Sequence, residues 1–217
     1  MKGYRLQVVG YSIIFFLLYT VHCTLYPVFA SEDIGSSKIS PASSFYFLKT
    51  IRENIEMKFA GTQRVKLIRQ LEFATRRLRE VKSLVGNKSE DLIVPTMERY
   101  WYHIQSLPDK NLQDQDFSTR ITENLAIHLE TLERVYNQLL NEHSSSSSKR
   151  AKMAIRATIN RLVGRADLPR NARLPACIFL TKEASSSALN ETERQILKER
   201  AGNCFKNLNF HTTLKVF

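Results

Sequence analysis

The sequence predicts an all-α protein, an antiparallel helical bundle followed by a small C-terminal helical appendage. Apolar residues recur at steps of three and four along most of the chain, which is the period of an amphipathic helix. The 217 residues include only seven glycines and six prolines. Such a scarcity of turn residues disfavours an all-β fold.

The first 30 residues have the pattern of a signal peptide or an N-terminal membrane anchor. Lys2 and Arg5 precede an apolar run from Leu6 to Val21, and Ala30 followed by Ser31 suits cleavage by a signal peptidase. If the segment is retained instead, it is long enough to cross a bilayer as a helix. Both alternatives direct the rest of the chain outward, because cations precede the apolar run and two acids follow it.

Residues 31–40 are rich in serine and predict a flexible lead-in. The first bundle helix is predicted from Phe45, with Ser43 or Ser44 as its N-cap. It ends at residues 60–62, where Gly61 interrupts the pattern. Its apolar positions at helical spacing are Leu48, Ile51, Ile55 and Phe59.

The second helix has the most regular apolar seam in the chain and ends at Gly86-Asn87. The seam consists of Leu67, Leu71, Ala74, Leu78, Val81 and Val85. Seven cations lie away from it, and a solvated helix surface is the expected role for them rather than a binding site. They are Arg64, Lys66, Arg69, Arg76, Arg77, Arg79 and Lys82.

Two further helices complete a predicted bundle domain of residues 41–143. The third carries Ile93, Met97, Tyr100, Ile104 and Leu107, with Pro95 in its first turn. After a polar loop over 108–116, the fourth begins at Ser118 and carries Ile121, Leu125, His128, Leu132, Val135 and Leu139. No second ligand lies at metal-binding spacing on this helix, so His128 is expected to be a hydrogen-bonded core histidine.

The five serines Ser144–Ser148 predict a flexible linker, 144–148, before a basic C-terminal helical segment, 149–217. A short helix with Ala151, Ile155, Ile159 and Leu162 should end at Gly164. An irregular stretch containing Pro169 and Pro175 follows. Asn190 and Glu193 then form a reciprocal cap for a last helix, with Ile196 and Leu197 facing inward and Gly202 ending it.

The net charge of +11 is concentrated near the C-terminus. Residues 31–143 contain 16 cations and 16 anions, whereas residues 144–217 contain 14 and 5. Lys149, Lys152 and Arg156 share one side of a helix and are the predicted contacts for an anionic partner. We expect anionic lipid, a cell-wall polymer or another envelope protein, and not nucleic acid, because no aromatic residues are interleaved with these cations.

Cleavage of the signal peptide would leave two cysteines, Cys177 and Cys204. An even number of cysteines in an exported chain favours a disulfide, which would staple the C-terminal segment. Free thiols are the alternative if the compartment lacks an oxidising system.

Candidate catalytic and cofactor sites are missing from the sequence patterns. The chain has no zinc-protease, nucleophile-elbow, phosphate-loop or Cys-x-x-Cys motif. We therefore expect a protein that is not an enzyme and that uses no cofactor or metal. A hydrolase would need His103, His128 and two carboxylates around one pocket. A stress-sensing or metal-sensing envelope protein would need ligands brought together in space.

Two sequence features resemble an uncharacterised bacterial family, number 5667 in the domain-of-unknown-function series. The first is Pro41-Ala42-Ser43-Ser44-Phe45-Tyr46-Phe47-Leu48-Lys49 soon after the signal peptide. The second is Glu72-Phe73-Ala74-x-x-Arg77-Leu78 in the following basic helix. The resemblance covers Pro41 to His143 and departs from the family pattern at Ser44 and at residues 60–62. It implies an exported helical domain, and it carries over neither activity nor site residues.

Together these features predict an exported, non-enzymatic helical module of the bacterial cell envelope with a structural or interaction role. It would be either secreted or anchored at the outer face of the cytoplasmic membrane.

Overall fold

The computed structural model describes residues 34–108, 115–142, 145–165, 168, 170–186 and 189–213. They belong to one compact unit, Asp33–Phe217. The predicted signal peptide or anchor lies outside the described residues. The described residues form helices joined by short turns, with no strand among them, which confirms the all-α prediction. Over the same ranges, no helix combines the length and apolar character needed to cross a membrane.

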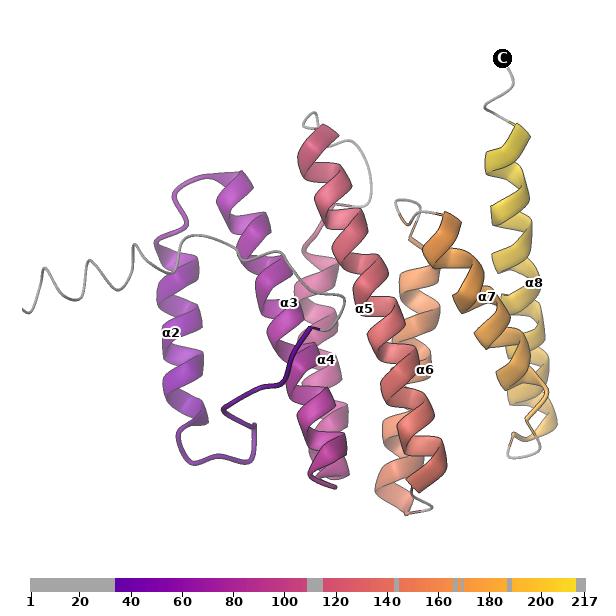
Figure 1. Cartoon of the computed structure of the whole chain (residues 1–217), viewed down its shortest axis with the longest axis horizontal. Helices are drawn as coiled ribbons and strands as arrows, with labels where there is room; N and C mark the ends of the chain where they lie inside the picture. The colour runs from indigo at the N-terminus through magenta and orange to yellow at the C-terminus, as the bar shows by residue number, and fades with distance from the viewer. Residues whose placement is uncertain are drawn as a thin grey trace, which may run out of the picture. The chain divides into compact units, whose positions relative to one another are not determined.

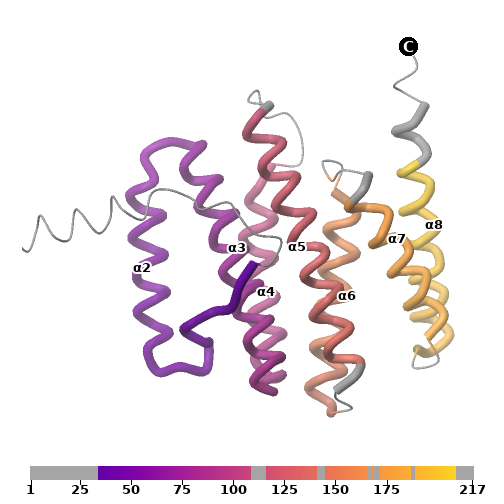
Figure 2. The backbone as a smooth tube through the Cα atoms, in the orientation of Figure 1, coloured from indigo at the N-terminus to yellow at the C-terminus, as the bar shows by residue number. Residues whose placement is uncertain are grey.

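The helices alternate in direction along the chain, as Figures 1 and 2 show. Helix α3 packs against α4 and α5, α6 packs against α4 and α5, and α7 packs against α5, α6 and α8. The predicted antiparallel helical bundle is therefore confirmed. The elements are α2 (Tyr46–Lys58), α3 (Gln63–Gly86), the 3-10 turn η1 (Glu90–Leu92), α4 (Ile93–Gln105), α5 (Gln115–Glu142), α6 (Ser146–Val163), α7 (Arg170–Ala184) and α8 (Glu191–Thr213).

The apolar stripes predicted for α3, α4 and α5 all lie in the core. Leu78, Tyr100 and Leu125, one from each helix, are fully buried. One hydrophobic cluster begins at Ile34 and continues to Leu208. Every residue of this cluster belongs to the compact unit Asp33–Phe217, so this unit has a hydrophobic core of its own, as a domain able to fold alone does.

The lead-in predicted to be flexible is instead attached to α3 over its described part. Ile34 is buried in the core, and its carbonyl accepts a hydrogen bond from Arg79. The backbone N–H of Ser37 donates to Ser83 Oγ at 3.0 Å. Gly35 turns the chain between these attachments with a φ of 73°, a conformation that glycine adopts without steric cost.

The serine run does not form a flexible linker over its described residues. Ser145 is the N-cap of α6, and its hydroxyl accepts from the N–H of Ser148 at 3.0 Å. Serine is favoured at this position because its oxygen satisfies an orphan helix donor. Ser148 is fully buried, and Ala151, Ile155, Ile159 and Leu162 continue the bundle core. The structure therefore places no domain boundary at these serines.

The C-terminal hairpin also corrects the predicted elements. Pro175 lies inside α7 rather than in an irregular stretch, and α8 continues through Gly202 to Thr213. An internal proline costs about 3 kcal/mol, and burial of Ala176, Cys177 and Leu180 offsets that cost. The reciprocal cap is confirmed, because the Asn190 N–H donates to Glu193 Oε2 at 3.1 Å and the Glu193 N–H donates to Asn190 Oδ1 at 2.8 Å. Leu197 is buried as predicted, but Ile196 is exposed.

The predicted starts of two helices are wrong. Helix α2 begins at Tyr46 after Phe45, which makes no side-chain cap, so neither Ser43 nor Ser44 occupies the N-cap position. Helix α5 already includes Gln115, which places Ser118 inside the helix. The residues 109–114 of the predicted loop lie outside the described part of the chain.

Candidate interaction surface

Helix α2 carries its apolar residues on the side away from the bundle. Phe45 is 65% exposed and Phe59 is 78% exposed, while Ile51 and Ile55 are each about half exposed. We call the outer face of α2 the side formed by Phe47, Leu48, Ile51 and Ile55 of the helix and by Phe59 at its C-cap, which are all exposed. All of them except Phe47 are positions whose helical spacing predicted the helix, yet none of the five belongs to the core.

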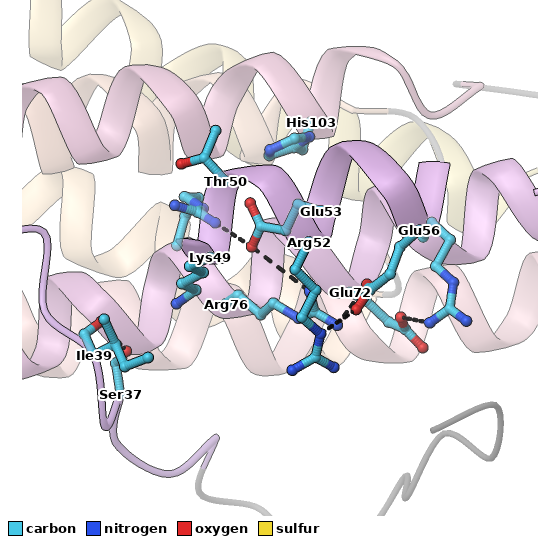
Figure 3. A network of polar contacts seen from close by, with 12 residues as sticks. Ser37, Ile39, Lys49, Thr50, Arg52, Glu53, Glu56, Glu72, Arg76 and His103 are labelled. Carbon is cyan, nitrogen blue, oxygen red and sulfur yellow. Dashed lines mark hydrogen bonds and ion pairs between the residues drawn. The ribbon is translucent and has the colours of Figure 1, made fainter. Parts of the chain in front are cut away.

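The opposite side of α2 is polar and lies against α3. This inner face consists of Tyr46, Lys49, Glu53 and Glu56. Glu53 pairs with Arg77, and Arg76 lies 2.9 Å from Glu56 and 3.6 Å from Glu53. Figure 3 shows Glu53 and Glu56 turned toward Arg76. The helix is thus attached to the bundle by ion pairs rather than by an apolar seam.

Glu80 of α3 is the second anchor of this interface and is completely buried. It accepts hydrogen bonds from Lys49 and, at 3.1 Å, from the Tyr46 hydroxyl. Arg77 lies 3.1 Å from Glu80 and also donates to the Tyr46 hydroxyl. Arg99 of α4 donates to the same hydroxyl at 3.1 Å. Tyr46 therefore links α2 to both α3 and α4.

Burial shifts the proton affinities of the paired groups. It raises the pKa of Glu53 to about 7, while Arg76 and Lys49 oppose this shift. Burial likewise lowers the pKa of Arg77, although the nearby Glu80 carboxylate raises it. The interface contains charged groups that have lost solvation, so removal of one partner should be costly.

The cations of α3 are only partly the solvated surface that the sequence predicted. Arg69 and Arg77 are buried, and Arg76 is only partly exposed. Arg69 pairs with Glu72 at 2.6 Å on its own helix. Arg76 and Arg77 are covered because the acidic inner face of α2 lies over them. A helical projection of residues 45–59 could have indicated this arrangement, because it separates an apolar side of the helix from a side that holds both acids.

The predicted anionic-partner residues do not form one free surface. Lys149 is exposed and Lys152 is half-buried. Arg156 is also half-buried, with its Nη1 atom 3.9 Å from Glu183 Oε2 of α7. Glu183 also accepts a hydrogen bond from the Tyr136 hydroxyl of α5. Arg156 therefore contributes to the packing between helices, and the three cations are not equivalent.

The predicted disulfide is present between Cys177 of α7 and Cys204 of α8. Both residues are buried, and the bond links positions 27 residues apart. It joins the two helices of the C-terminal hairpin.

The two histidines considered for catalysis are held by hydrogen bonds within the helix packing. His128 is buried, with Thr75 Oγ1 2.9 Å from Nε2 and the Tyr100 hydroxyl 3.2 Å from Nδ1. Burial lowers its pKa to about 3. Gln70 Oε1 accepts a hydrogen bond from His103 Nδ1 at 2.7 Å, and burial lowers the pKa of His103 to about 4. No group of three potential metal ligands occurs among the residues that the structure describes.

Comparison with known proteins identifies the bundle domain. Residues 38–142 match the family described as Domain of unknown function (DUF5667). The match begins in the segment that enters α2 and ends at the last residue of α5, so it includes α2 and the face of α3 that holds it. Neither the curated proteins nor the solved structures gave a match. Over residues 38–142, this chain is a DUF5667 domain.

Proposed function

We propose that the protein is an exported, non-enzymatic interaction module of the bacterial cell envelope, and that it binds its partner through the outer face of α2. The outward orientation of the apolar side chains is the observation that carries this proposal. Exposed apolar residues scattered singly need no explanation, but a contiguous exposed patch is typical of an interaction site.

The way in which α2 is held supports the same proposal. Its inner face is specified by ion pairs and hydrogen bonds to Arg76, Arg77 and Glu80. A helix with this apolar content could bury its apolar side only by rotating about half a turn, which would expose Glu53 and break these pairs. The buried network therefore fixes the outward orientation.

The extracytoplasmic location rests on the sequence pattern of residues 1–30, and the proposal of no enzymatic activity rests on the lack of a catalytic motif. The metal-sensing and hydrolase alternatives have no specific observation in their favour. Anionic lipid, wall polymer and envelope protein remain the partner classes suggested by the charge.

Site-specific photocrosslinking of the full chain in cells tests this function. A photoreactive residue at position 51 should form an adduct, whereas the same residue at position 178 should not. Ile178 of α7 is a matched control, since it is also an exposed isoleucine on a helix. Equal labelling at the two positions, or none at position 51, would contradict a contact through α2.

A further inference from the structure

We infer that the occupant of the outer face of α2 is the surface of an anionic membrane, on which the helix lies parallel to the lipid plane. This inference rests on the proposed function and specifies its partner. The outer face presents two phenylalanines and three aliphatic side chains, all exposed. Aromatic and aliphatic side chains on one helix face, with cations beside them, are typical of interfacial helices.

The charges around the outer face favour an anionic surface. From Ile34 to Lys66 the sequence has six lysines and arginines but only two acids, Glu53 and Glu56. Both acids belong to the inner face and pair with α3, and Glu56 also pairs with Arg52 of α2 at 2.6 Å. Arg52 and Lys58 of α2 are exposed, and Lys38, Arg64 and Lys66 are exposed on either side of the helix. The region offers exposed positive charge beside apolar residues, a combination that attracts acidic lipid headgroups.

The sequence also places this unit close to a membrane in the anchored alternative. The apolar N-terminal segment ends at Ala30, four residues before Ile34. Four extended residues span at most about 14 Å. Ile34 is itself fixed to α3 through its carbonyl and its burial. A retained anchor would therefore leave no more than this length of chain between its apolar segment and Ile34.

A second copy of the chain fits the same face less well. A two-fold contact through α2 would place the exposed cations of both copies at one interface, where the acids of α2, Glu53 and Glu56, are already paired within each copy. Like charges that are brought together at an interface oppose association. An anionic bilayer accepts both the apolar residues and the cations.

Vesicle binding by residues 33–217, the compact unit with its own core, tests this inference without the N-terminal apolar segment. The vesicles contain phosphatidylglycerol mixed with phosphatidylcholine, or phosphatidylcholine alone. We expect binding to the mixed vesicles that weakens as salt rises. The double substitution Ile51→Gln with Ile55→Gln should weaken it by at least about tenfold, and Lys58→Gln should weaken it by a smaller factor.

Matched substitutions on the other helices provide the controls. Ile178→Gln with Ile196→Gln changes two isoleucines of similar exposure on α7 and α8, and Lys198→Gln changes an exposed lysine of α8. These variants should bind as the parent does. Insertion is measured separately with Ile51→Trp in a Trp101→Phe background, whose fluorescence should be quenched by brominated lipid. Circular dichroism establishes that every variant keeps its helical fold.

The outcomes separate this inference from the proposed function. No binding to anionic vesicles, or binding indifferent to the α2 substitutions, overturns the membrane surface as the occupant. If the α2 substitutions instead abolish a dimer seen by sedimentation, the occupant is a second copy. If α2 becomes protected from hydrogen exchange only in the full chain without lipid, the occupant is the N-terminal segment. In both cases α2 remains a contact surface, whereas photocrosslinking that fails at position 51 removes the proposed function itself.

Discussion

Helices α2 and α3 have the same kind of sequence pattern, but the apolar face of α3 is turned into the bundle and that of α2 is turned away from it. Both carry apolar residues at steps of three and four. In α3 these residues form the centre of the bundle, with Leu78 and Val81 completely buried. In α2 they point away from it, and a buried acid, Glu53, faces the neighbouring helix instead.

The difference shows that periodicity identifies a shared face but does not decide whether that face is buried. The apolar seam of α3 is occupied by α4 and α5, so α2 meets the other side of α3, which is rich in arginine. Against that surface, acids and a tyrosine hydroxyl make better contacts than isoleucine does. Ion pairing thus determines the orientation of α2, and its apolar side remains available.

The largest expected effect is loss of the bundle on Leu78→Asp. This change places an unpaired charge in the centre of the core and should destabilise by more than about 4 kcal/mol. Ile51→Asp on the outer face of α2 is the matched control and should change stability by about 0.5 kcal/mol or less. Circular dichroism and urea unfolding measure both. An unchanged melting curve for Leu78→Asp would contradict the assignment of α3 to the core.

The next largest effect should come from Arg77→Ala, which leaves the buried acids Glu53 and Glu80 without their shared cation. Breaking a buried pair in this way costs about 3 kcal/mol. We expect hydrogen exchange to accelerate in α2 while α5 stays protected. Arg52→Ala removes an exposed pair with Glu56 and should cost no more than about 1 kcal/mol. Equal effects of the two substitutions would show that buried ion pairs do not hold α2.

The C-terminal hairpin provides a third way of holding a helix, through a covalent bond. Replacing Cys177 and Cys204 together by alanine should destabilise the α7–α8 pair by about 3 kcal/mol in the chain-entropy model. Proteolysis should then cleave α8 first, and the region from α3 to α5 should resist. Uniform sensitivity along the chain would indicate that the hairpin and the bundle unfold as one unit.

The smallest expected effects are pH dependences of opposite sign in the two regions. The pKa of Glu53 is raised to about 7, so protonation of this carboxyl stabilises the folded state. This contribution to the free energy of unfolding is fully present below about pH 4.5 and is lost as the pH rises through 7. The pKa of His128 is lowered to about 3, so the neutral form of its imidazole stabilises the folded state. This contribution to the free energy of unfolding is fully present above pH 6.5 and is lost as the pH falls toward 3.

These two signs are separable with single variants. As the pH rises from about 4.5 to 7, protection of the α2 amides from hydrogen exchange should fall in the parent relative to the Glu53→Gln variant. As the pH falls below 6.5, protection of the α5 amides from hydrogen exchange should fall in the parent relative to the His128→Gln variant. Hydrogen exchange at several pH values measures both, and slopes of the same sign would contradict the assigned environments.

Much of the fold was predictable because α3, α4 and α5 bury the stripes that their sequences mark. The Asn190–Glu193 cap and the Cys177–Cys204 disulfide were predictable for a similar reason, since short spacing or an even cysteine count limits the possibilities. The serine run was misread because five serines resemble a linker by composition, whereas Ser145 acts as a helix cap. Pro175 was misread because a local cost was outweighed by core burial.

The candidate surface was less predictable. The spacing of Leu48, Ile51 and Ile55 predicts that they pack in the bundle, and the charge of the α3 arginines predicts that they face solvent. Each assignment follows from one helix considered alone. The prediction that Lys149, Lys152 and Arg156 contact an anionic partner also considered one helix alone. Arg156 pairs with Glu183, which lies on a different helix.

The sequence alone determined that the chain forms amphipathic helices, where most of them lie and which residues share a face, because these properties depend on local spacing and on caps. Tertiary structure decided which face of α2 is covered. That choice depends on which side of α3 remains uncovered after α4 and α5 have packed on its apolar seam. The remaining side carries Arg76, Arg77 and Glu80, so the acids of α2 face inward to pair with the arginines and the apolar residues of α2 face outward.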